Sequence, residues 1–228
     1  GSKPKPYVFG VNRNEGVFFL PASSTMTPEQ YENAVVQTFG AALAQEIMAY
    51  SEDGKRLYDP AGYEPLPIGG MTTASQALGQ LQTDYGVAAA NMKSASRALP
   101  QLEKAGVSSF GYHFVQHSEF NFAGMERCNP PSGNICHTTE MPYVFSNFLK
   151  KTAVGAFEPA DDVTDADKAL ADTMTQAWAN FAKNPDQGLG HPKLTNANSD
   201  EYVHWGTPVT IGDLIPKARY DFWETILP

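Results

Sequence analysis

Only two segments of this chain have the pattern of a β-strand, and most of the sequence between them has helical character. Residues 7–11 follow two prolines, and residues 107–116 combine alternating polarity with β-branched and aromatic side chains. Two strands so far apart in sequence cannot form a stable sheet alone, because an isolated pair is marginal in water. Strand–helix–strand order predicts a layered α/β fold. Both strands are therefore expected to belong to a larger sheet.

Several segments have clear helical signals. Thr27-Pro28-Glu29-Gln30 has the residues of a helix start, and apolar residues at four-residue spacing then predict a helix to about Ala49. A second helical region is expected over residues 73–105, with breaks near Tyr85-Gly86 and at Pro100. Further helices are predicted over residues 142–149, 164–184 and 216–227.

Charge and composition exclude several classes of protein. The 228 residues carry a formal net charge of −9, whereas nucleic acids and anionic membrane surfaces require clustered Lys and Arg. No stretch approaches the roughly 18 consecutive apolar residues of a membrane-spanning helix. A hydrophobic content of 42% with 13 Phe, 10 Tyr and 3 Trp indicates a packed core rather than disorder. We therefore expect neither nucleic acid nor membrane as a partner.

The only two cysteines, Cys128 and Cys136, flank a segment rich in turn-forming residues that includes Pro130 and Pro131. This spacing favours a disulfide that closes a small loop, the alternative being two reduced thiols in a cytosolic protein. A disulfide predicts an oxidising compartment, and hence a secreted or periplasmic protein. Only His137 is close enough in sequence to add a ligand for zinc, so no metal site is predicted.

Two residues with catalytic potential follow the two predicted strands. Glu15 comes just after the first strand, where an open α/β sheet places functional groups. His137 follows the second strand by a loop. Taken singly, Glu15 is compatible with a solvated turn and His137 with an exposed loop. Together they match the order acid, then histidine, that completes a triad in α/β-hydrolases.

Other titratable groups favour structural roles. His113 and His117 lie four residues apart on the second strand and therefore on one face. A metal pair would suit this spacing, but packing or surface histidines are the favoured interpretation. The acidic run over residues 161–167 lacks the alternating oxygen ligands and turn glycine of a calcium loop, and it indicates a helix start.

Four motifs carry a resemblance to a known family. Residues 10–20 closely resemble the acid-bearing motif of type-B carboxylesterases and cholinesterases, which reads Gly-x-Asn-x-x-Glu-Gly followed by aromatic residues. Residues 137–145 resemble that family's histidine motif, residues 178–185 its late helix, and residues 221–223 its closing helix. The motifs occur in the family's order over nearly all of the chain. The resemblance implies the C-terminal part of an α/β-hydrolase fold, with the last strands of the sheet and the surrounding helices.

The resemblance also implies a chemistry. Glu15 would be the acid and His137 the general base of a Ser-Glu-His triad that hydrolyses a small carboxylic ester without a cofactor. His137 would take the proton of a serine hydroxyl and deliver it to the leaving alcohol, while Glu15 orients the imidazole. Phe18 and Phe19 would line the acyl or alcohol pocket, and Glu140 would support the site from outside it.

The sequence departs from the family at its nucleophile. These 228 residues contain no Gly-x-Ser-x-Gly elbow and no His-Gly-Gly-Gly oxyanion segment, both of which the family carries upstream of the acid. We therefore expect residues 1–228 to be the C-terminal portion of one catalytic domain, with residues 1–6 a tag remnant or cleaved end. Such a chain would be inactive alone and would pair with an N-terminal esterase portion that carries the serine. The alternative is a non-catalytic, cholinesterase-like binding or interaction module, which would need neither Glu15 nor His137.

Overall fold

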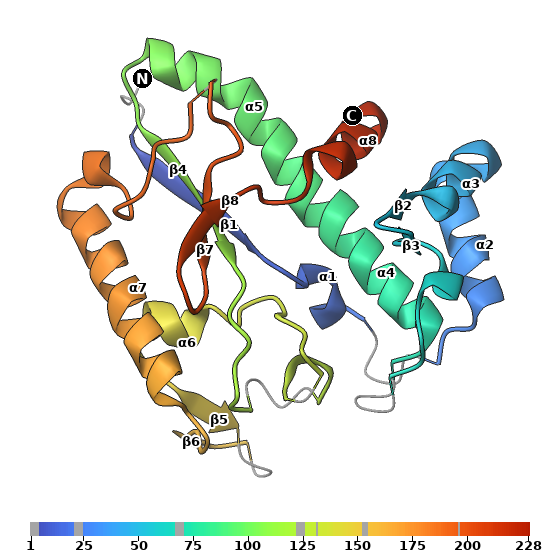
Figure 1. The fold of residues 1–228 in the computed structure, drawn as a ribbon, viewed down its shortest axis with the longest axis horizontal. Helices are drawn as coiled ribbons and strands as arrows, with labels where there is room; N and C mark the ends of the chain where they lie inside the picture. Colours follow the sequence, from blue (N-terminus) through green and yellow to red (C-terminus); the bar gives the residue numbers. More distant parts are fainter. Residues whose placement is uncertain are drawn as a thin grey trace.

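A mixed sheet with helices on both faces forms the centre of the molecule (Figure 1). The computed structural model describes residues 5–20, 25–66, 71–121, 126–130, 132–151, 155–195 and 197–228. Residues 1–4 of the expected tag remnant and Pro131 of the cysteine loop lie outside these ranges. The layered α/β architecture predicted from strand–helix–strand order is confirmed.

The sheet has the order β1-β4-β7-β8, and its first three strands are parallel. The strands are β1 (Tyr7–Asn12), β4 (Ser109–Phe114), β7 (Tyr202–Trp205) and β8 (Thr210–Gly212), with β8 antiparallel to β7. Both predicted strands are confirmed, whereas β7 and β8 had not been expected because runs of four and three residues give no periodic signal. Within the described ranges β1 pairs with β4 alone, so one side of β1 is a sheet edge.

The register of β1 and β4 sets where the following loops meet. Gly10 lies opposite Tyr112, and a Cβ atom on Gly10 would come within 2.2 Å of the Tyr112 ring. Glycine is therefore required here for the ring to cross over the edge strand. Asn12 lies opposite Phe114 at the carboxyl ends of the two strands. The segments that leave β1 and β4 consequently start from the same edge of the sheet.

One face of the sheet is covered by α4 (Thr73–Thr83), the π-helical segment η3 (Asp84–Ala88) and α5 (Ala89–Lys104). Three further helices extend this layer: α2 (Pro28–Phe39), α3 (Ala41–Ala49) and α8 (Lys217–Ile226). Their shared core includes Val11, Tyr31, Ile47, Leu99 and Trp223.

Two details of this layer differ from the sequence prediction. The helix expected to reach Ala49 is two helices, because Gly40 adopts a φ of 81° between them. The break expected near Tyr85-Gly86 is a widened π-helical turn, and the helix continues through it. Pro100 lies inside α5 rather than at a break.

The opposite face is covered by α7 (Asp165–Lys183) and α6 (Met141–Val144). Thr164 caps α7 through a capping box with Asp167, at the start of the helix that the sequence predicts over residues 164–184. The core on this side includes Phe114, Tyr143, Leu170, Met174 and Trp205. The helix expected over residues 142–149 is the shorter α6, because the backbone turns at Ser146, whose φ is 47°, and Leu149 belongs to the next strand.

Short elements complete the chain. They are α1 (Glu15–Phe18), the hairpins β2 (Ser51–Glu52) with β3 (Lys55–Arg56) and β5 (Leu149–Lys151) with β6 (Phe157–Pro159), and the 3-10 turns η1 (Pro60–Gly62), η4 (Glu126–Cys128) and η5 (Pro185–Gln187). No helix within the described ranges is both long and apolar enough to span a bilayer.

Candidate active site

Glu15 and His137 lie in contact at the carboxyl edge of the sheet. The Oε2 atom of Glu15 is 2.6 Å from Nδ1 of His137, and its Oε1 accepts a hydrogen bond of 2.7 Å from the backbone N–H of Asn12. The Glu15 side chain is 8% exposed, whereas that of His137 is 46% exposed. A buried carboxylate thus holds one ring nitrogen of an imidazole that remains open to solvent.

The pKa of Glu15 reflects its buried position beside His137. Burial raises the pKa of its carboxyl above the ordinary value, and the nearby Glu140 adds to the increase. The N–H of Asn12 and the His137 imidazole oppose that increase by hydrogen bonding, and His137 also by charge. A carboxylate in this position fixes the tautomer of the imidazole, because it accepts the proton on Nδ1.

The glycine after Glu15 allows α1 to pack closely against α4. A Cβ atom on Gly16 would lie 2.4 Å from the carbonyl oxygen of Gly79, closer than any side chain can approach. The N–H of Gly16 donates to Oγ1 of Thr83 at 2.9 Å, and that hydroxyl donates to the Gly79 carbonyl at 2.8 Å. The helix that carries Glu15 is therefore fixed by contact with α4.

The loop that carries His137 is anchored at several points. Cys128 and Cys136 form the predicted disulfide, with their Cα atoms 5.6 Å apart. The N–H of Asn14 donates to the Ile135 carbonyl at 2.9 Å, and the N–H of Ile135 donates to Oδ1 of Asn14 at 3.0 Å. The loop is thereby clamped to the segment that precedes Glu15.

The other predicted site residues surround the pair. The rings of Phe18 and Phe19 have centroids 5.6 and 5.2 Å from that of His137. Phe19 is 57% exposed and also lines an apolar pocket of about 400 Å³ formed with Phe39 and Tyr85 among others. Glu140 contacts Asn12 rather than His137, since its Oε2 accepts a hydrogen bond of 2.5 Å from the Asn12 side chain.

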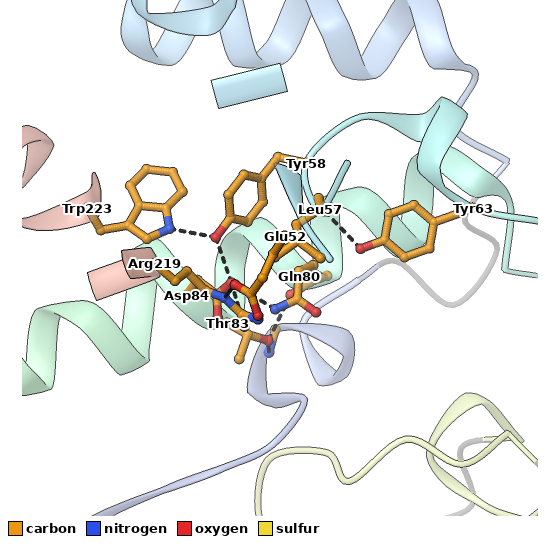
Figure 2. A network of polar contacts seen from close by, with 11 residues as sticks. Glu52, Leu57, Tyr58, Tyr63, Gln80, Thr83, Asp84, Arg219 and Trp223 are labelled. Carbon is orange, nitrogen blue, oxygen red and sulfur yellow. Dashed lines mark hydrogen bonds and ion pairs between the residues drawn. The ribbon is translucent and has the colours of Figure 1, made fainter. Parts of the chain in front are cut away.

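A buried network of polar contacts begins at Asp84, the residue after Thr83. Figure 2 shows Asp84 accepting hydrogen bonds at Oδ2 from Tyr58 (2.7 Å) and Gln80 (2.8 Å), with Arg219 of α8 at 3.5 Å. Trp223 of α8 donates to the Tyr58 hydroxyl at 2.7 Å. Burial raises the pKa of Asp84, and the charge of Arg219 opposes this. The network ties the last helix to the helical segment against which α1 packs.

Sequence reasoning missed several residues of the site. Asn12 and Asn14 lie inside the quoted acid motif, but nothing in the motif showed that they bond to the histidine loop. Thr83 gave no local signal, because its partner Gly16 is 67 residues away.

The sequence predicted that His113 and His117 share one face of a strand, but only His113 lies in β4. His113 packs edge-to-face on His204 of β7 at 5.1 Å, while the exposed His117 lies beyond the end of β4. In the part of the chain that the structure describes, no three His, Cys, Asp or Glu residues are grouped to hold a metal ion.

Comparison with known proteins places these features in a family. The family model described as "Carboxylesterase family" matches residues 1–223. Human cocaine esterase is 24% identical over 245 residues, which cover 99% of this chain and 38% of the relative. The "Crystal protein" of Dictyostelium discoideum is 24% identical over 97% of this chain and 35% of the relative.

A solved structure shares the fold. Aspergillus niger EstA superposes with a TM-score of 0.64 at 16% identity, over 96% of this chain and 39% of that one. The present chain thus spans less than two fifths of the length of each of these proteins. A family match over nearly all of its residues, together with the acid and histidine motifs, shows that the chain belongs to the carboxylesterase family.

Proposed function

We propose that this chain supplies Glu15 and His137 as the acid and the general base of a Ser-Glu-His triad that hydrolyses carboxylic esters. The observation that carries the proposal is the 2.6 Å contact between Glu15 Oε2 and His137 Nδ1, with the imidazole otherwise open to solvent. His137 Nε2 takes the proton of a serine hydroxyl as its oxygen attacks the ester carbonyl, then gives it to the leaving alcohol. A water molecule then attacks the acyl-enzyme in the same way: His137 takes a proton from the water and returns it to the serine oxygen, and the carboxylic acid is released.

The serine belongs to a second portion of the enzyme. The chain contains no nucleophile elbow, and it spans 38% of the length of its cocaine esterase relative. We propose that residues 1–228 are the C-terminal portion of the catalytic domain. Among the described residues only β4 pairs with β1, and the other side of β1 suits the addition of a strand from the N-terminal portion, because edge strands offer free N–H and C=O groups.

The surroundings of His137 favour an ester with an apolar or aromatic group. Phe18 and Phe19 pack beside the imidazole, and Phe19 also lines the apolar pocket of about 400 Å³. Apolar surfaces of this kind bind by excluding water. The Cys128–Cys136 disulfide supports a secreted or periplasmic location, since such bonds persist in oxidising compartments.

Hydrolysis of p-nitrophenyl esters tests the proposal. The isolated chain is expected to show no turnover, and the chain combined with a serine-bearing N-terminal portion is expected to show turnover that His137→Ala abolishes. Turnover by the isolated chain that disappears in His137→Ala would contradict the need for a second portion. Turnover of the combined enzyme that survives His137→Ala would contradict the triad. Intact-mass measurement of the natural source material identifies whether a second chain co-purifies.

A non-catalytic binding or interaction module is the second candidate. The observation in its favour is the relative named "Crystal protein", a name that denotes no activity, which matches over 97% of this chain. A combined protein that hydrolyses no ester and retains its folding and association after Glu15→Gln and His137→Ala would support this candidate.

A further inference from the structure

Asn12 takes no part in the chemistry of the triad, yet its side chain lies at the centre of the site. It is the last residue of β1 and is 1% exposed. We propose that Asn12 is a positioning residue whose side-chain amide fixes the His137 loop in register with Glu15. This inference rests on the proposed function, because only that function makes the position of His137 relative to Glu15 important for catalysis.

The amide brackets His137 from both sides. Its Nδ2 donates to the carbonyl of Cys136, the residue before His137, at 2.8 Å. The same nitrogen donates to Oε2 of Glu140, three residues after His137, at 2.5 Å. The backbone N–H of Asn12 meanwhile donates to Glu15 Oε1. One residue therefore contacts the acid and both flanks of the base.

Only an amide of this length meets the chemistry of the site. The Cys136 carbonyl and the Glu140 carboxylate both require donors, and the NH₂ group of Asn supplies two. An aspartate would place a third acceptor against them, and a leucine of similar volume would supply a donor to neither. The opposite orientation of the amide would turn its oxygen toward two acceptors, so the hydrogen-bond partners fix which atom is the nitrogen.

Asn12 also lowers the stability of the folded chain. Oδ1 of Asn12 is buried with no hydrogen-bond partner among the described residues. Burying a polar atom without a hydrogen bond destabilises the folded chain. A residue chosen for stability alone would avoid that cost, which favours a role for the two donors.

The loop needs such a constraint. Thr138, directly after His137, has a φ of 72°, a conformation that is strained for a β-branched residue. The Cys136 carbonyl also accepts a hydrogen bond of 2.8 Å from Oγ1 of Thr139, so the strained turn is held from within as well. Asn12 adds the contact that joins this turn to the strand bearing the acid.

Proton NMR of the chain tests the role without relying on ester turnover. The Nδ1 proton of His137, held by Glu15, is expected to give a low-field resonance that disappears in His137→Ala, which assigns it. Asn12→Ala is expected to lose this resonance or to shift it upfield, while circular dichroism shows the fold retained. Asn198→Ala is the matched control: it removes an acceptor at 2.7 Å from the N–H of Thr195, far from the site, and is expected to leave the resonance unchanged. A folded Asn12→Ala with the wild-type resonance would overturn the proposal.

A second pair of variants covers the case in which Asn12→Ala does not fold. Glu140→Gln keeps a side-chain oxygen that accepts from Asn12, and it is expected to retain the resonance. Glu140→Ala removes that acceptor and is expected to broaden or shift it. Identical resonances in the two variants would overturn the proposal. The two proposals can fail separately. If the resonance depends on Asn12 but the chain shows no ester turnover with a serine-bearing portion, the proposed function is refuted and the positioning role of Asn12 stands.

Discussion

Glu15 and His137 are 122 residues apart in sequence, yet their side chains meet at 2.6 Å. The contact exists because parallel β1 and β4 end at the same edge of the sheet, so that the segments after them converge. Each partner is held by contacts of its own, Glu15 through Gly16 on α4 and His137 through the disulfide loop.

Glu15→Gln is expected to lower kcat of the combined enzyme by about 10⁴-fold, because the amide can donate to Nδ1 and thereby select the wrong tautomer of His137. The rate of p-nitrophenyl ester hydrolysis measures the loss. Glu29→Gln, at an exposed position in α2, is the control and should leave kcat unchanged. A combined enzyme in which both variants keep the wild-type rate would exclude Glu15 as the acid.

Gly16→Ala is expected to destabilise the chain by about 1–3 kcal/mol, since its Cβ atom would overlap the backbone oxygen of Gly79 and displace α1. Gly86→Ala is the matched control, because a Cβ atom there meets nothing within 4 Å. That variant should be neutral or slightly stabilising. Urea unfolding compares the two, and equal midpoints would show that α1 is not constrained by α4.

Arg219→Gln should reduce the free energy of unfolding by about 3–5 kcal/mol, because it breaks the 2.6 Å ion pair with Glu52 and also removes the cation beside the buried Asp84. Adding Asp84→Asn to that variant should recover part of the loss, which a double-mutant cycle detects. Arg56→Gln breaks an ion pair whose Arg56 side chain is 60% exposed, and it should change stability by no more than about 0.5 kcal/mol. Strictly additive losses in the cycle would contradict the pairing of Asp84 with Arg219.

His113 gives the chain a pH dependence of stability. Burial lowers the pKa of His113 to about 3, and the positive charges of His204, Arg13 and Arg219 contribute. The unfolded chain binds this proton near pH 6.5 and the folded chain does not, so stability falls as the pH drops from 6.5 toward 3. The slope from this one group reaches at most about 1.4 kcal/mol per pH unit. His113→Gln should flatten the profile in urea unfolding between pH 4 and 6.5, and parallel profiles would contradict the assignment.

Replacing Cys128 and Cys136 together by serine should destabilise the chain by about 2.5 kcal/mol, the loop-closure entropy for a short loop. The same loss should follow reduction of the wild-type chain with dithiothreitol. Dithiothreitol added to the serine variant provides the control and should have no effect. A wild-type midpoint that is insensitive to reduction would argue against a stabilising disulfide.

The local features of the chain were predictable from its sequence. The caps at Thr27 and Thr164, the strands β1 and β4, and the positions of Glu15 and His137 after those strands all have signals within a few residues. The strands β7 and β8 were not predictable, because they are short and owe their stability to pairing with β4 and with each other. The division of the first helix at Gly40 was missed because its apolar spacing continues across the break.

By itself, the sequence determined which residues could carry the chemistry and that each one follows a β-strand. Only the tertiary structure decided that the amide of Asn12 reaches the carbonyl of Cys136, 124 residues away, and that Thr83 holds Gly16. The physical reason is that hydrogen bonds between distant segments leave no periodic or compositional trace in either segment. Their geometry exists only once the parallel sheet has brought the ends of β1 and β4 together.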